Sequence, residues 1–245
     1  ELNLPQAVRQ LGRANNGLIL VTGKTGSGKS TTLAAMIDDI NRRVKGHILT
    51  VEDPIEFVHE RKNCLISQRE IGAHAASFAA ALHSALREDP DVILVGELRD
   101  LETMSIAVTA AEMGILVMGT LHTNGAAPTV DRMVNAFPAD KQSHVRTMLS
   151  TSLRGVISQQ LMQRADKNGR VAALEILVNT AAVSNLIRQG KLDQLETVMQ
   201  SGAQAGMRTM DSAIEQLLKE RQISGKEAYK KGINKARFEP VKEQG

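Results

Sequence analysis

Two hydrophobic patterns alternate along the first 178 residues of the chain. Short runs in which every position is apolar, such as Leu18-Ile19-Leu20-Val21, are typical of strands buried on both faces of a parallel sheet. Longer segments carry apolar residues at every third or fourth position, which is typical of helices packed on one side. The strands predicted from these patterns cover residues 18–21, 47–51, 65–68, 91–96, 115–120 and 171–178.

The helical segments fall between the strands. We predict helices over residues 5–12, 29 to about 43, 77–87, 101–113 and 140–153. Ser77 is placed to cap the third of these helices. Strands that alternate with helices form parallel sheets with crossover helices. The pattern therefore predicts an α/β fold with a RecA-like, doubly wound core and a mainly parallel sheet.

After residue 178 the pattern contains only helices. They are expected at about 180–189, 191–200, 209–221 and 224–230. Gly190, residues 202–206 and Ser224-Gly225 separate them, because glycine and serine clusters end or start helices. We therefore expect two parts, a RecA-like ATPase core over residues 1–178 and a helical C-terminal subdomain over residues 179–245.

The turn after the first strand carries the strongest chemical signal. Residues 23–30, Gly-Lys-Thr-Gly-Ser-Gly-Lys-Ser, match the P-loop pattern G-x-x-x-x-G-K-[ST] between a strand and a helix. Glycines let the backbone N–H groups curl around phosphates, and the helix N-terminus adds its positive end. We expect Lys29 to reach the β- and γ-phosphates of ATP and Ser30 to ligate Mg²⁺. The predicted nucleotide-binding residues are Gly23, Thr25, Gly26, Ser27, Gly28, Lys29, Ser30 and Thr31.

Acidic residues follow two other predicted strands. Residues 91–97 form an apolar run that ends at Glu97, the shape of a Walker B strand. Gly96 stands where such strands usually carry Asp, so we expect Glu97 itself to approach Mg²⁺ through water. Residues 52–56, Glu-Asp-Pro-Ile-Glu, place three carboxylates after the second strand, and one of them is positioned to polarise the attacking water. A surface acid at Glu97 and a solvated acidic turn at 52–56 are the alternatives.

A histidine follows the strand predicted over residues 115–120. His122 lies in the segment Thr120-Leu121-His122-Thr123-Asn124, after a strand end of the kind where ligands of open α/β sheets bind. We interpret it as a sensor of the γ-phosphate. The alternative is a histidine with a purely structural role.

Composition narrows the function classes. Aromatic residues make up 2% of the chain, and 30 basic against 27 acidic residues give a net charge of +3, so nothing favours a nucleic-acid partner. We interpret the basic run over residues 226–242 as a solvated face or tail. The single cysteine, Cys64, is interpreted as a core residue in a reduced, cytosolic protein. No run of 18 apolar residues is present, so we expect no transmembrane segment.

Taken in order, these motifs resemble the secretion ATPase superfamily. The P-loop and residues 52–56, 96–100 and 121–124 match its Walker A, Asp box, Walker B and His box. Within this superfamily the chain most closely resembles the type IV pilus retraction ATPases, over nearly all of its 245 residues. The resemblance implies Mg²⁺-dependent ATP hydrolysis, with Glu56 as the catalytic glutamate, Glu97 as the Walker B acid and His122 as the His-box residue.

The resemblance also implies an assembly. It implies a homo-hexamer in the full-length protein, cytoplasmic and peripheral to the inner membrane, which acts on an inner-membrane platform protein at the base of a pilus. The chain starts at Glu1 rather than Met, and a PAS-like domain that supplies arginines to the nucleotide is implied upstream. We therefore expect residues 1–245 alone to be mostly monomeric, to bind ATP or ADP and to hydrolyse ATP slowly. The arginines that could partly compensate are Arg87, Arg99 and Arg132.

Three other functions are weighed. The related motors of pilus assembly or type II secretion typically carry a four-cysteine zinc module, which a single Cys64 does not provide. A nucleic-acid translocase on a RecA-like core would need a basic channel with aromatic residues. A non-catalytic nucleotide-binding scaffold would not need Lys29, Ser30, Glu56 and Glu97 together.

Overall fold

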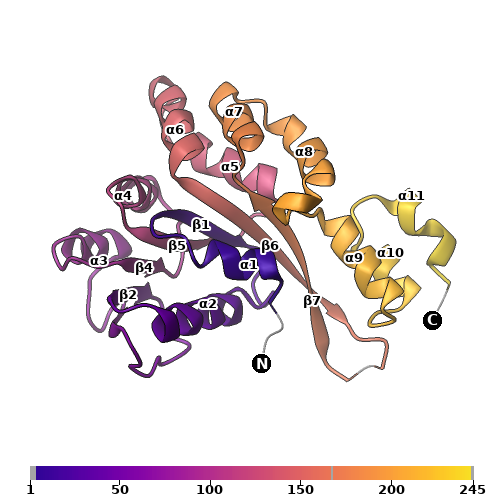
Figure 1. Cartoon of the computed structure of the whole chain (residues 1–245), viewed down its shortest axis with the longest axis horizontal. Coiled ribbons are helices and arrows are strands. Elements are labelled where there is room, and N and C mark those ends of the chain that lie inside the picture. Colours follow the sequence, from indigo (N-terminus) through magenta and orange to yellow (C-terminus); the bar gives the residue numbers. More distant parts are fainter. Residues whose placement is uncertain (1–3, 167, 244–245) are drawn as a thin grey trace.

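The computed structural model describes residues 4–166 and 168–243, and Glu1 lies outside these residues. Seven strands form one sheet in the order β3-β2-β4-β5-β1-β6-β7 (Figure 1). All neighbouring strands pair in parallel except β6 and β7, which are antiparallel. The strands are β1 (Gly17–Thr22), β2 (His47–Glu52), β3 (Leu65–Glu70), β4 (Val92–Val95), β5 (Leu116–Leu121), β6 (Leu153–Gln163) and β7 (Arg170–Val178).

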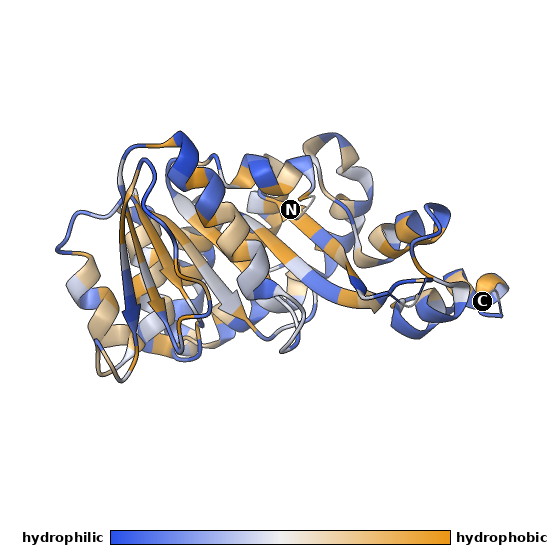
Figure 2. Cartoon of the chain, turned by 90° about the horizontal axis from the view of Figure 1, so that it is seen from below, coloured by the Kyte–Doolittle hydropathy of each residue, from blue (hydrophilic) through white to orange (hydrophobic). Residues whose placement is uncertain are grey.

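Alternate residues of β1, β2, β4 and β5 enter two separate hydrophobic layers. In β1, Ile19 and Val21 face helices α1 (Gln6–Leu11) and α2 (Lys29–Arg43), while Leu18 and Leu20 face the opposite layer. The opposite layer is covered by α3 (Phe78–Ala85), α4 (Leu101–Glu112), α5 (Ala126–Asn135), α6 (Ala139–Ser152), α7 (Ala181–Gln189) and α8 (Leu195–Ser201). Figure 2 shows hydrophobic strands between helices with hydrophilic outer faces. The α/β fold with a mainly parallel sheet is therefore confirmed.

The last helices form a third hydrophobic cluster at one end of the molecule (Figure 1). Helices α9 (Met210–Lys219), α10 (Gly225–Lys231) and α11 (Lys235–Phe238) pack around the buried ring of Phe238. Met162 of β6 and Ala173 of β7 belong to the same cluster, so the β6–β7 hairpin joins it to the sheet. Helices α7 and α8 instead contribute to the large layer that contains α5 and α6. The boundary at residue 178 stays a prediction.

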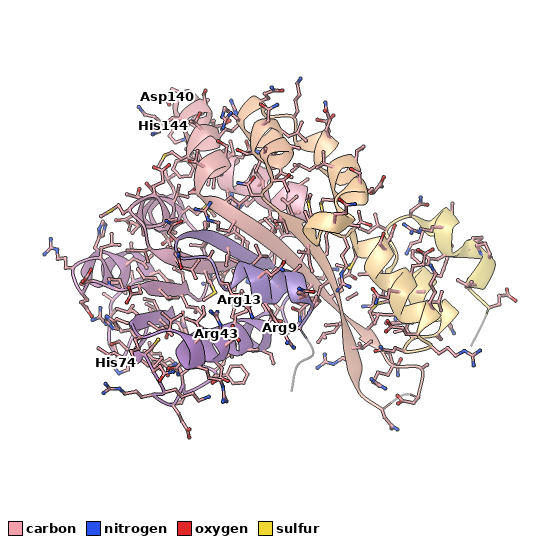
Figure 3. The ribbon with its side chains drawn as sticks, viewed as in Figure 1. Arg9, Arg13, Arg43, His74, Asp140 and His144 are labelled. Atoms are coloured by element: carbon pink, nitrogen blue, oxygen red, sulfur yellow. The ribbon has the colours of Figure 1, made fainter. Side chains whose placement is uncertain are left out.

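Contacts between helices at the amino end of the chain fix its first segment. The Arg43 guanidinium of α2 donates to the carbonyl of Gly12, which ends α1, at 3.1 Å. Figure 3 labels Arg43 close to Arg13, the residue after Gly12. This contact closes α1 over the layer that α2 covers.

The predicted elements occur in the structure, and one strand, β6, and two α-helices, α5 and α11, were missed. Ser77 caps α3 as expected, because its hydroxyl accepts from the Ala80 N–H. Strand β6 follows α6 without a break, and the polar residues 158–160 interrupt its apolar run. Helix α5 opens at a glycine and contains Pro128, which hides its helical pattern. No helix in the described part of the chain has the length and apolar character that crossing a bilayer requires.

Candidate active site

Four parallel strands deliver the predicted motifs to one edge of the sheet. The P-loop follows β1, residues 52–56 follow β2, Glu97 follows β4 and His122 follows β5. Because parallel strands end at the same edge, these segments meet around a cavity of about 420 Å³. The predicted residues that line it are Thr25, Gly26, Gly28, Lys29, Ser30, Thr31, Glu52, Asp53, Glu56, Glu97 and His122. Ser27 instead lines a neighbouring cavity of about 610 Å³.

The P-loop has the backbone that phosphate binding needs. Gly23, Gly26 and Gly28 have φ angles of 142°, 77° and 89°, which side-chain-bearing residues rarely adopt. Helix α2 begins at Lys29 without a side-chain cap, so its first N–H groups face the loop. These N–H groups and the positive end of the helix suit a phosphate.

Lys29 lies inside the loop that it is expected to serve. Its ammonium donates to the carbonyls of Gly23 at 2.7 Å and Lys24 at 3.1 Å. Burial lowers the pKa of Lys29, and the nearby carboxylates of Glu97 and Glu56 act in the opposite direction. A buried ammonium held by two neutral carbonyls is complementary to an anion, which the predicted phosphates would supply.

Gln159 of β6 clamps the P-loop from behind, and sequence reasoning missed it. Its amide donates to the Ser27 carbonyl at 2.7 Å, and its oxygen accepts from the Thr32 hydroxyl at 2.7 Å. A Cβ at Gly23 would lie 2.4 Å from the Gln159 carbonyl oxygen, and one at Gly28 would lie 2.7 Å from its side-chain nitrogen. Gly23 is therefore needed for the close approach of the β6 backbone as well as for its φ angle, while a side chain at Gly28 would displace the Gln159 amide.

Glu97 is held between two cationic or polar partners. Arg99 contacts one of its oxygens at 2.7 Å, and His122 Nε2 lies 3.1 Å from the other. The hydrogen bond from Arg99, followed by the contribution of His122, lowers the pKa of Glu97, against the opposing effect of burial. The His122 side chain is 47% exposed, so it is not a core histidine. The sequence did not predict this contact between His122 and Glu97.

Gly96 explains the departure of this segment from the usual Walker B pattern. A Cβ at Gly96 would lie 3.2 Å from both the Glu52 Cα and the Val51 carbonyl oxygen. The Gly96 N–H also donates to the Val51 carbonyl at 2.7 Å. The end of β4 therefore presses against the end of β2, and an aspartate at position 96 would push the two strands apart.

The acids after β2 are not equivalent. Glu52 turns toward its own strand, where it accepts from the Thr50 hydroxyl at 2.7 Å and from Gln68 at 3.4 Å. Asp53 and Glu56 are exposed and line the cavity. Glu52 therefore supports the strand end, whereas the Glu56 carboxylate stays exposed on the cavity wall and acts on the nearby Lys29 ammonium.

The three candidate arginines occupy different places. Arg99 lines the cavity and contacts Glu97. Arg132 donates to the Arg99 carbonyl at 3.4 Å, and neither Arg132 nor Arg87 lines the cavity. Arg170, at the start of β7, does line it and was missed from the sequence, because its position depends on the β6–β7 hairpin.

The site fits a nucleotide with Mg²⁺ better than Mg²⁺ alone. Among the residues that the structure describes, no three His, Cys, Asp or Glu side chains gather to hold a metal ion. Mg²⁺ prefers octahedral oxygen sites and usually takes one or two protein ligands together with phosphates and water. Ser30 and Glu97, on the cavity wall, are the residues that would contribute to such a site.

Comparison with known proteins now gives the family. The family model described as "Type II/IV secretion system protein" matches residues 2–239. The chain belongs to this secretion family. The resemblance drawn from the four motifs is thereby confirmed.

Several members of the secretion family are similar in sequence over most of the chain. The twitching motility protein of Neisseria gonorrhoeae is 56% identical over 234 residues, which are 96% of this chain and 63% of the relative. The type IV pilus retraction ATPase PilT of Pseudomonas aeruginosa is 53% identical over 231 residues, which are 94% of this chain and 67% of the relative. The chain thus spans about two thirds of the length of these curated relatives.

Solved structures of the secretion family share the fold. The pilus retraction motor PilT, crystallised with bound ADP, superimposes with a TM-score of 0.91 at 48% identity, covering 98% of this chain and 68% of that one. The ATPase DotB of Legionella pneumophila gives 0.84 at 33% identity, covering 92% and 62%. The RecA-like ATPase fold predicted from the sequence is confirmed by these matches.

The clamp by Gln159 leads to a prediction about nucleotide affinity. Replacing Gln159 by Leu leaves the Ser27 carbonyl and the Thr32 hydroxyl unpaired, and such losses cost about 1–3 kcal/mol each. We expect the Kd for a fluorescent ADP analogue to rise about tenfold, because the loop is no longer held in shape. Gln160→Leu, a change at the next residue of β6, is the control and should bind normally. Equal affinities for the wild type and Gln159→Leu would contradict the clamp.

The contact between Arg99 and Glu97 leads to a prediction about pH. A carboxyl with a lowered pKa stabilises the folded protein above its ordinary pKa of 4.5, and this contribution is lost as the pH falls through the lowered value. Arg99→Ala should move the titration midpoint of Glu97 up toward 4.5. The midpoint is measured from the chemical shift of the Glu97 carboxyl carbon as the pH is changed. Arg132→Ala should leave the midpoint in place. A midpoint that stays low without Arg99 would mean that other groups hold Glu97 charged.

Proposed function

We propose that the chain is the motor part of a Mg²⁺-dependent ATPase that retracts type IV pili and so drives twitching motility. One observation carries the proposal: a single cavity gathers the P-loop, the exposed Glu56 and the contact of Glu97 with His122 and Arg99. The names of two similar proteins, a twitching motility protein and a pilus retraction ATPase, support the same function.

Binding begins at the P-loop. The N–H groups at the start of α2 and the Lys29 ammonium surround the β- and γ-phosphates of ATP, and Thr31 donates to the α-phosphate. Mg²⁺, when bound, offsets the negative charge of the phosphates, with Ser30 as its protein ligand and Glu97 near it through water. Lys29 exchanges its two carbonyl partners for phosphate oxygens, which favours its charged form.

Glu56 acts as the general base in this proposal. Its carboxylate is exposed at the cavity wall, and the structure gives it no strand-supporting role like that of Glu52. A carboxylate in this place orients the attacking water toward the γ-phosphate and takes up its proton. The proposal assigns Glu56, and not Asp53, because the family resemblance implies the last acid of the segment and because Glu56 acts on the Lys29 ammonium, whereas Asp53 acts on Arg99.

Glu97, Arg99 and His122 respond to the γ-phosphate as a unit. His122 and Arg99 share the two oxygens of Glu97, so a change in the charge beside Glu97 alters both contacts. When the γ-phosphate leaves, His122 loses an anionic partner and returns to Glu97. The segment after β5 thereby reports whether ATP or ADP is bound.

The working unit is proposed to be a homo-hexamer at the base of a pilus, in the cytoplasm and against an inner-membrane platform protein. Arg99 and Arg170 are the arginines of the described residues that line the cavity, and Arg99 is engaged with Glu97. Phosphoryl transfer gains about 10³–10⁵ in rate from an added arginine. A neighbouring subunit or a further domain is the source we propose for it.

A motor for type II secretion is the second candidate. The type II secretion protein E of Aeromonas hydrophila is 45% identical over 161 residues, which are 64% of this chain and 29% of that relative. Identity with the twitching motility relatives is higher and extends over more of the chain. The single Cys64 also cannot form a four-cysteine zinc module.

Two substitutions separate binding from chemistry. Lys29→Ala should abolish turnover and weaken ATP binding, because Lys29 contacts the transferred phosphates. Glu56→Gln should keep ATP binding and reduce kcat about 10²–10⁴-fold, because it removes the base alone. Steady-state ATPase assays and nucleotide titrations on the protein that contains this chain measure both effects. Asp53→Asn is the matched control, and a Glu56→Gln protein as active as the wild type would rule out the assignment.

His122 has its own expected signature. If His122 senses the γ-phosphate, His122→Ala should slow hydrolysis more than it weakens ADP binding. A histidine with only a structural role would instead lower the melting temperature while turnover per folded molecule stays constant. Thermal melts recorded beside the kinetics decide between these outcomes. A drop in melting temperature with unchanged kcat would show that His122 is structural.

A further inference from the structure

Glu175 is a buried carboxylate that the chemistry described above does not use. It lies on β7 opposite Ser158 of β6, with 8% of its surface exposed. One of its oxygens accepts from the Ala126 N–H at 2.8 Å, and the other accepts from the Met210 N–H at 3.0 Å. Ala126 is the first residue of α5, and Met210 is the first residue of α9. A single side chain therefore joins the amino ends of two helices that are far apart in the sequence.

Helix α5 depends on the sheet for its cap. Its capping residue, Gly125, has no side chain and adopts a φ of 100°. The Gly125 N–H donates to the Ser158 hydroxyl at 2.9 Å, and the next N–H donates to Glu175. Two strands thus supply the acceptors that most helices carry in their own sequence. Helix α5 starts four residues after His122, so these two acceptors fix the segment that contacts Glu97.

The second helix end that Glu175 contacts, the start of α9, belongs to the C-terminal helices. Arg208 and Ile176 form a short antiparallel bridge, with N–O distances of 2.9 and 3.1 Å. The Arg208 guanidinium also donates to the Leu174 carbonyl at 2.7 Å. Helix α9 begins two residues later, where its first N–H meets Glu175. The three residues 174–176 of β7 therefore carry the start of the α9–α11 cluster.

The charge of Glu175 suits this position. Two helix N-termini point at the carboxylate, and both favour a negative charge. Burial raises the pKa of Glu175, the hydrogen bonds from the Ala126 and Met210 backbones lower it, and the nearby carboxylates of Glu196 and Asp211 raise it further. An ionised carboxylate has two acceptor oxygens and no donor, so each oxygen can accept from one of the two helix ends.

We propose that Glu175 is a positioning residue for ATP hydrolysis, which ties the His122 segment to the α9–α11 cluster so that the two move together. The proposal rests on the ATPase function proposed above. Movement of the His122 segment, when the γ-phosphate is lost, would pull on Ala126 and through Glu175 on Met210. The P-loop is clamped by Gln159, whose hydrogen bonds involve neither Glu175 nor the helix ends that Glu175 joins, so we expect loss of the link to change nucleotide binding little.

The test replaces Glu175 by Gln in the protein that contains this chain. Glutamine keeps one acceptor oxygen and turns an NH₂ group toward the other N–H donor, so one helix end loses its partner. We expect kcat to fall about tenfold while the KM for ATP changes less than about twofold, the pattern of a lost positioning contact. Ser158→Ala removes one acceptor from the start of α5. It should also lower kcat, by a smaller factor than Glu175→Gln does.

Asp211 provides a matched control. It is also 8% exposed and accepts from two backbone N–H groups, those of Ile233 at 2.7 Å and Asn234 at 2.9 Å. Both of its partners lie within the C-terminal cluster, away from His122. Asp211→Asn should lower the melting temperature and keep kcat. Equal losses of kcat in Glu175→Gln and Asp211→Asn would mean that destabilisation of the cluster alone explains the effect, and the proposal would be wrong.

Hydrogen exchange separates this proposal from the ATPase function. Glu175→Gln should increase exchange at the Ala126 and Met210 amides, whereas Asp211→Asn should leave Ala126 protected. Unchanged protection at both amides, or wild-type kcat in both Glu175→Gln and Ser158→Ala, would overturn the proposal. A wild-type protein that does not hydrolyse ATP would overturn the proposed function, and the exchange data would still decide whether the link exists.

Discussion

Strand β6 passes so close behind the P-loop that a Cβ at Gly23 would lie 2.4 Å from the backbone carbonyl oxygen of Gln159. This approach fixes the shape of the phosphate cradle, because Gln159 bonds to both the loop and the following helix. It also fixes where the rest of the chain goes, since β6 turns back as β7 and carries the C-terminal cluster. The phosphate cradle and the C-terminal cluster are thus both attached to β6, so the position of this strand determines the position of each.

Most charged side chains of the cavity contact a group of opposite charge or a polar group. Arg99 and His122 keep Glu97 in its charged form, while Lys29 is held by two carbonyls with carboxylates nearby. Asp53 and the proposed base, Glu56, stay exposed at the cavity wall, and Glu56 is the one of the two that acts on the Lys29 ammonium. In such a site the acids are already placed before the nucleotide binds, and the phosphates of the nucleotide supply the negative charge that Lys29 lacks.

The parts of the site that follow strands directly were predictable from the sequence. The P-loop, Glu56, Glu97 and His122 each follow an apolar run, and parallel strands bring such positions together whatever the details of packing. Gln159, Ser158 and Glu175 were not predictable, because they lie on a strand pair whose partners are distant: Gln159 and Ser27 are 132 positions apart. Their polar side chains even concealed β6. The helices α7 to α10 were found and α11 was missed, and the packing of α7 and α8 with the large layer is not revealed by any local pattern.

The pairing of β6 with β7 has a mechanical consequence. Nine consecutive residue pairs, from Gly155 and Val178 to Gln163 and Arg170, join the two strands without an interruption. Strands β6 and β7 cannot slide along each other, because all the hydrogen bonds between them would have to break at once. The β6–β7 hairpin can still bend and twist. The adjacent residues Ser158 and Gln159 point to opposite faces of the sheet, Ser158 toward α5 and Gln159 toward the P-loop. A twist of the β6–β7 hairpin therefore moves these two side chains in opposite directions. The hairpin therefore resists sliding, and bending and twisting are the motions by which it would connect the nucleotide site with the C-terminal cluster.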